Sequence, residues 1–99
     1  MSLVLLTLSA GVADAEAIAA ALRDALGVPV HQRAETVLGR DFEDAGTVER
    51  VAGALARIAI ELTIPAEQVL QALEVATTTR RRLPFRWRTV AALDGGRIE

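Results

Sequence analysis

Short apolar runs and segments of helical periodicity follow one another along the first part of the chain. Leu3 to Leu8 is a continuous apolar run ending at Ser9-Ala10-Gly11, a pattern typical of a central strand buried on both faces. From Asp14 to Leu26 apolar residues recur every three or four positions. This spacing predicts a helix with Asp14 as N-cap and Gly27 as a left-handed C-terminal residue.

The next segment, Val28 to Leu38, alternates in polarity. One side of this segment carries Val30, Ala34 and Leu38. The other side carries His31, Arg33, Glu35 and Val37. This alternation predicts a second strand with one face in water. Strand, helix and strand with short connections favour a right-handed crossover and parallel pairing in one sheet. A polar loop is expected over residues 39–46.

The second half predicts two helices and two strands. Thr47 to Leu62 is expected to form a helix, because apolar residues recur at helical spacing: Val48, Val51, Ala52, Leu55, Ile58, Ala59 and Leu62. Pro65 opens a second helix to Thr77, which completes a helix–turn–helix pair. Leu83 to Leu93 alternates as a strand, and a turn at Asp94-Gly95-Gly96 leads to a short strand at Arg97–Glu99.

Length and pattern together predict one α/β (α+β) domain over residues 1–99. We expect two layers in the order β-α-β-α-α-β-β, with a four-stranded mixed sheet and three helices. The 52% of hydrophobic residues provides for a packed core. Phe85 and Trp87 alternate with Arg86 and Arg88, so the two aromatic residues are predicted to be core.

Composition limits the class of protein and the cellular location that we expect. The chain has no Cys, which excludes disulfides and thiolate metal sites, and every one of its 11 basic residues is Arg. No apolar run approaches the ~20 residues that a membrane-spanning helix needs. We therefore expect a bacterial, cytoplasmic domain that does not enter the membrane.

Catalysis is not expected, because the chain lacks Cys, Lys and Tyr and His31 is its single histidine. No glycine-rich phosphate loop is present either, so no cofactor is predicted. Four acidic residues could hold a hard cation, namely Asp41, Glu43, Asp44 and Glu49. An acidic solvated loop before a helix is the more frequent case, so no metal is predicted.

An arginine cluster is the most informative feature of the sequence. Its members are Arg80, Arg81, Arg82, Arg86 and Arg88. Residues 1–49 carry eight acids and three arginines, whereas residues 50–99 carry eight arginines and five acids. The cluster fits three interpretations: phosphate contacts beside a helix–turn–helix, a solvated strand face with Arg86 and Arg88 near Arg33 and Glu35, or a protein-binding surface. Glu67 and Glu74 on the second helix disfavour DNA.

The layout of residues 48–99 also resembles a known family. Two helices lead into Arg80-Arg81-Arg82, followed by a strand, Asp94-Gly95-Gly96-Arg97 and another strand. This order is similar to small bacterial domains called effector-associated constant components. The resemblance implies a non-catalytic adaptor that accompanies protease or nucleotide-signalling effectors in bacterial conflict systems.

The sequence thus predicts a non-enzymatic protein–protein interaction or adaptor module that self-associates as a homo-oligomer. Its partner-binding residues are expected to be Arg80, Arg81, Arg82, Arg86 and Arg88, which would receive an acidic partner or the acidic half of another copy. The alternative is a small helix–turn–helix protein that binds nucleic acid through the same region.

Overall fold

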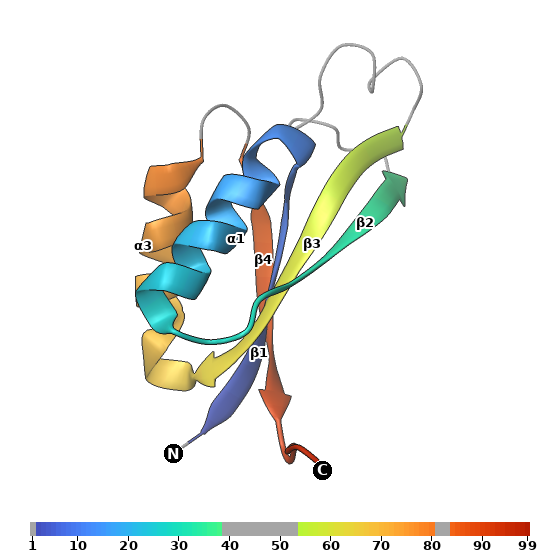
Figure 1. Cartoon of the computed structure of the whole chain (residues 1–99). Helices are drawn as coiled ribbons and strands as arrows, with labels where there is room; N and C mark the ends of the chain where they lie inside the picture. Colours follow the sequence, from blue (N-terminus) through green and yellow to red (C-terminus); the bar gives the residue numbers. More distant parts are fainter. Residues whose placement is uncertain (1, 39–53, 81–83) are drawn as a thin grey trace.

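The secondary-structure elements alternate along the chain of the computed structural model, which describes residues 2–38, 54–80 and 84–99. In chain order they are β1 (Leu3–Gly11), α1 (Val12–Leu26), β2 (His31–Leu38), β3 (Ala54–Pro65), a short 3-10 helix (Ala66–Gln68), α3 (Val69–Thr79) and β4 (Arg86–Ala92). The described residues form a small α+β domain, in which both α-helices pack on one face of a four-stranded sheet (Figure 1).

Every pair of neighbouring strands in the sheet is antiparallel, and the strand order is β2-β3-β1-β4. The prediction of β1 as a central strand is confirmed. The prediction of a mixed sheet is wrong, because β3 lies between β1 and β2 and pairs antiparallel with both. After the crossover through α1, strand β2 does run in the same direction as β1. The two strands are separated by β3, as in split β-α-β arrangements.

The predicted helix from Thr47 to Leu62 is wrong over its described part. Residues 54–65 form strand β3, in which Ile60, Leu62 and Ile64 are fully buried under the helices and alternate with Glu61 and Thr63. Residues 47–53 lie outside the described residues. With one of its two helices replaced by a strand, the helix–turn–helix pair is absent from the described residues, which hold two α-helices instead of the three expected.

The predicted helix at 14–26 is confirmed as α1, including its end at Gly27, and only its N-terminal end is corrected. Gly11, in extended conformation, occupies the N-cap position, whereas Asp14 lies buried in the first turn. Gly27 ends the helix at φ 65°, and its N–H donates to the carbonyl oxygen of Arg23 at 2.9 Å. A Cβ atom is sterically unfavourable in this left-handed conformation, so glycine is favoured at this position.

The predicted helix after Pro65 is also present, as the 3-10 turn followed by α3. Ala72 and Ala76 of α3 are fully buried, and their small side chains allow the helix to approach both the sheet and α1. Leu70 of α3 is exposed.

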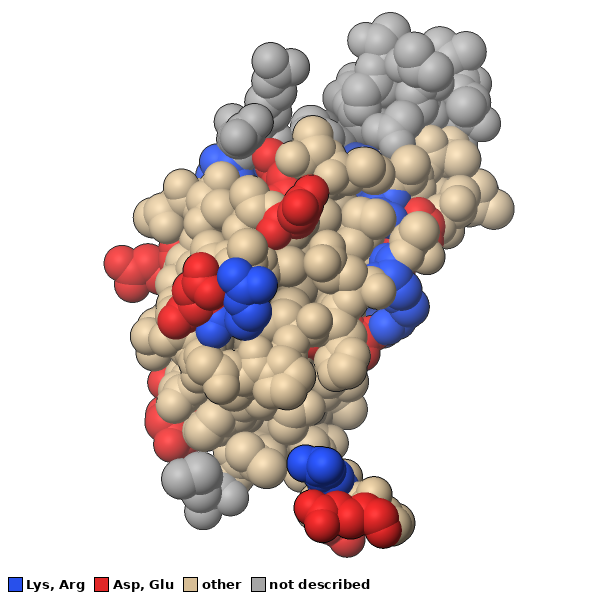
Figure 2. Space-filling view, viewed as in Figure 1, with Lys and Arg blue, Asp and Glu red and all other residues tan. Residues whose placement is uncertain are grey.

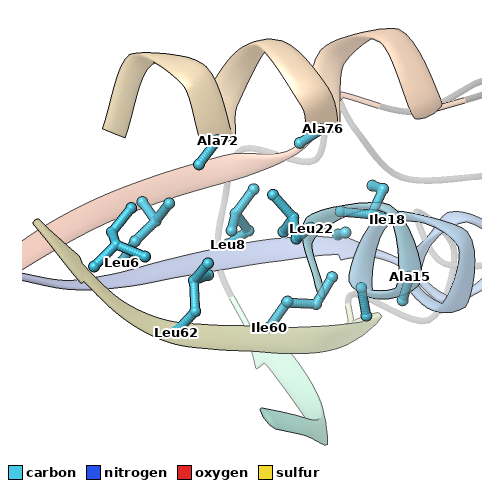
Figure 3. Close-up of a cluster of buried hydrophobic side chains, with 12 residues drawn as sticks. Leu6, Leu8, Ala15, Ile18, Leu22, Ile60, Leu62, Ala72 and Ala76 are labelled. Carbon is cyan, nitrogen blue, oxygen red and sulfur yellow. The ribbon is translucent and has the colours of Figure 1, made fainter. Parts of the chain in front are cut away.

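The core lies between the helices and the sheet (Figure 3). Its largest fully buried side chains are Leu6, Leu8, Ile18, Leu22, Ile60, Leu62 and Ile64. Phe85 packs against this cluster as predicted, but Trp87 is 51% exposed, so its prediction as a core residue is wrong. Trp87 is on the edge strand β4, where no further strand covers it.

The C-terminal hairpin is not formed, since Arg97–Glu99 is not a strand. At the expected turn, the N–H of Gly95 donates to Oδ1 of Asp94 at 2.8 Å. Within the described ranges there is no helix with the length and apolar character needed to span a bilayer.

Candidate interaction surface

One face of the sheet carries no helix of the described residues. Both α1 and α3 pack on the face that presents Leu6, Leu8 and Ile60, and no described element covers the opposite side (Figure 1). We call that side the uncovered face. The strand registers assign to it Leu3, Leu5, Thr7, Ser9, His31, Arg33, Glu35, Val37, Leu55, Arg57, Ala59, Glu61, Thr63, Arg86, Arg88, Val90 and Ala92.

The uncovered face has an arginine end built from all four strands. In one row of the register, Arg33 of β2, Ala59 of β3, Ser9 of β1 and Arg86 of β4 lie side by side. In the next row Arg88 lies beside Thr7, which neighbours Glu61 and then His31. Short side chains in the middle strands and long ones at both edges leave a hollow of about 240 Å³.

The lining of this hollow agrees with the geometry of one of the three interpretations of the arginine cluster, the strand face. Arg86 and Arg88 line it together with Arg33 and Glu35, which come from the other edge of the sheet. Side-chain alternation in the two predicted strands, Val28–Leu38 and Leu83–Leu93, had placed these four residues on one polar face. Trp87 also borders the hollow, but the register sets it opposite Leu8, on the helix-covered side.

Two polar interactions cross the strands of the uncovered face. The hydroxyl of Ser9 donates to Oε1 of Glu35 at 2.7 Å, which links β1 to β2 across β3. The register places Ala59 between Ser9 and Arg33, and its methyl group leaves room for this bond. Arg33 forms an ion pair with Glu61 through Nη1 and Oε1. These contacts occupy both glutamates of the face with partners from this chain.

Arg57 is the buried charge of the uncovered face. Its residue is 3% exposed, and Nη1 donates to the carbonyl oxygen of Ala56 at 2.6 Å. Because the residue is buried, Arg57 does not contribute to the accessible arginine surface.

The other end of the uncovered face is apolar. Leu5 pairs with Val90, and Leu3 pairs with Ala92, at the end of the sheet near the chain termini. Val90 is 54% exposed and Leu3 is 44% exposed. Apolar side chains grouped on a sheet face are typical of a surface that binds another molecule.

The predicted site residues do not share one location. Arg86 and Arg88 lie on the uncovered face, whereas Arg80 is an exposed residue that follows α3 in the helix layer. Arg81 and Arg82 lie outside the described residues, as do the candidate cation ligands Asp41, Glu43, Asp44 and Glu49. His31 is exposed on the edge strand β2, opposite Glu61.

The sequence analysis missed the apolar part of this face. Leu3 and Leu5 belong to a run interpreted as a strand buried on both sides, so their partial exposure was not expected. The available signal was the alternation of Val90 and Ala92 with Thr89 and Ala91 in β4, which continues the face that begins with Arg86 and Arg88.

The helix layer has the opposite charge balance to the uncovered face. Exposed acids outnumber arginines on α1, the 3-10 turn and α3, with Glu16, Asp24, Glu67 and Glu74 against Arg23 and Arg80. Figure 2 shows several acidic side chains on the helix side of the molecule. The uncovered face carries four arginines and two glutamates. Among the described residues, the two sides of the domain therefore have opposite net charge.

Comparison with known proteins relates the chain by fold alone. No protein-family model and no curated protein matches it. Among solved structures, it is similar to a DUF3240 family protein from Shewanella baltica OS155, with TM-score 0.80 and 16% identity over 100% of this chain and 99% of that one.

Two further structures share the arrangement. A Bacillus cereus protein related to NIF3 matches with TM-score 0.70 and 16% identity, over 97% of this chain and 26% of that one. A Pediococcus pentosaceus ATCC 25745 protein described as functionally unknown matches with TM-score 0.71 and 12% identity, over 99% of both chains. At these identities the likeness establishes a common fold and carries no function across.

Proposed function

We propose that the chain is a non-enzymatic interaction module that self-associates, with the uncovered face receiving a second copy. The observation that carries this proposal is an uncovered sheet face with an apolar end and an arginine end. Leu3, Leu5 and Val90 provide apolar area, and Arg86 and Arg88 provide charge beside it. This combination of apolar contact and flanking charge is typical of protein interfaces.

Charge complementarity supports a second copy as the occupant. Arg86 and Arg88 stand on a face with excess positive charge, and the exposed acids of α1 and α3 give the other side of the same chain excess negative charge. Opposite potentials attract at a distance and favour complementary contacts. A second copy brings its acidic side within reach of the arginines of the first.

The flat area of the face can be estimated from its strands. Four strands about 4.8 Å apart and nine residues at about 3.4 Å each give roughly 550 Å². Stable complexes bury roughly 800 Å² per partner, and the buried residues Leu55, Arg57 and Ala59 add little accessible area, so an interface on this face alone would be a small one. Covering the face would remove Leu3 and Val90 from water.

The test is the mass in solution, measured by light scattering after size exclusion. The wild-type chain should exceed the mass of one subunit. Val90→Asp places a charge in the apolar end and Arg88→Glu reverses a charge in the arginine end, so each should shift the mass toward one subunit. Ile98→Asp and Arg97→Glu are matched controls, because both residues are highly exposed in the C-terminal segment beyond β4.

Circular dichroism must show that all four variants keep the wild-type fold. A wild-type chain with the mass of one subunit at every concentration, or association that survives both Val90→Asp and Arg88→Glu, contradicts the proposal. Fluorescence anisotropy with duplex DNA forms a further arm, since binding that weakens steeply with salt would indicate phosphate contacts and a nucleic-acid role instead. A place beside conflict-system effectors, which the family resemblance implies, stays a prediction.

A further inference from the structure

We propose that the hollow at the arginine end of the uncovered face binds a small phosphorylated molecule through its phosphate group. The inference goes beyond self-association and does not require it, because the hollow is built within one chain. Its floor and walls come from β1, β2 and β4, with the methyl group of Ala59 on β3 between them.

The donor set is suited to an oxyanion. Arg33, Arg86 and Arg88 line the hollow with the hydroxyl-bearing residues Thr7 and Ser9. A guanidinium group presents a planar fork of N–H donors that matches two oxygens of a phosphate, and hydroxyl groups add single donors. Arg33 on one edge strand and Arg86 and Arg88 on the other thus border one space that no described side chain fills.

The charged side chains of the hollow differ in the partners that they have within the chain. Arg33 is paired with Glu61, and Glu35 accepts the hydroxyl of Ser9. Among the described residues Arg88 forms no ion pair. A phosphate group in the hollow would therefore contact Arg88 first.

The size of the hollow limits the ligand. About 240 Å³ is below the roughly 300–1,000 Å³ of pockets that hold drug-sized molecules. Trp87 borders the hollow, but its register with Leu8 assigns it to the helix-covered side of β4. A phosphate monoester with a short carbon skeleton fits both limits, and an aromatic base is not needed for recognition.

The experiment is isothermal titration of the wild-type chain with inorganic phosphate, glycerol 3-phosphate and succinate, at a concentration where light scattering shows a constant mass. Glycerol 3-phosphate should bind at one site per chain and more tightly than inorganic phosphate. Arg88→Gln should weaken its binding about tenfold or more, the usual effect of losing a charge-assisted hydrogen bond. Arg97→Gln, a matched change in the C-terminal segment, should bind as the wild type does.

Each alternative result is decisive. No binding of either phosphate compound overturns the proposal, as does an Arg88→Gln variant that binds like Arg97→Gln, because the ligand then lies elsewhere. Equal binding of inorganic phosphate and glycerol 3-phosphate shows that the carbon skeleton is not recognised and overturns the choice of a monoester. Succinate that binds as tightly as glycerol 3-phosphate overturns the choice of phosphate. Because a second copy on the uncovered face would cover the hollow, the constant mass chosen for the titration is that of one subunit, and under that condition the two proposals fail separately.

Discussion

Ile60→Ala tests most sharply whether residues 54–65 are a strand. Ile60 is fully buried against the helices in β3, yet it is absent from the apolar stripe of the helix that the sequence favours over 47–62. Replacing a fully buried Ile by Ala removes its transfer free energy and leaves a cavity, a loss of about 2–5 kcal/mol. A strand therefore predicts a large effect at this residue, and the helix predicts a small one.

The assay is urea and thermal unfolding followed by far-ultraviolet circular dichroism. A loss of about 3 kcal/mol lowers Tm by roughly 12–24 °C in a domain of this length. Ile98→Ala is the matched control, because Ile98 is 100% exposed and its truncation should stay within about 0.5 kcal/mol. All variants are compared at one protein concentration, since association stabilises by mass action. If Ile60→Ala loses less than about 1 kcal/mol, the strand assignment is refuted.

Three further outcomes are expected. Gly27→Ala should cost about 1–2 kcal/mol because of the left-handed backbone alone, since a Cβ would meet nothing within 4 Å, whereas Gly95→Ala should be neutral in the same melts; equal effects would refute this. Ser9→Ala should cost about 1 kcal/mol and show coupling to Glu35→Ala in a double-mutant cycle, and purely additive losses would exclude the cross-strand bond. Trp87 fluorescence should be readily quenched by iodide, and protection would contradict its half-exposed position.

The sequence predicts a helix instead of strand β3 because the apolar residues of this segment match both the helical period and the strand period. Ile58, Ile60, Leu62 and Ile64 alternate and face the helices, but Leu55 and Ala59 are also buried, on the uncovered face. A strand buried on both faces loses clean alternation, and its apolar residues then coincide with helical spacing. Only pairing with both β1 and β2, which is a non-local fact, decides between the two periods.

The edge strands are easier to predict for the same reason. β2 and β4 each have one neighbour, so their polar residues keep a strict alternation. That alternation was sufficient to place Arg33 and Glu35 on one face with Arg86 and Arg88. It could not show the hollow between them, which depends on a short residue, Ala59, at one register position of β3.

The arginine cluster shows the limit of reading neighbours in sequence as neighbours in space. Arg80 and Arg86 are six positions apart, yet the first follows a helix in one layer and the second lies on the opposite face of the sheet. Arg33, far away in the sequence, lines the same hollow as Arg86. Sheet register, and not sequence distance, assembles the basic surface.

The most direct test of the proposed interface uses the absence of cysteine in the chain. A single thiol is introduced as Val90→Cys on the uncovered face, or as Ile98→Cys in the C-terminal segment, and its reaction rate with a thiol reagent is followed from low micromolar to near-millimolar protein. The rate for Val90→Cys should fall as the mass from light scattering rises, while the rate for Ile98→Cys stays constant. Equal rates for both variants across that range would show that a second copy does not cover the uncovered face.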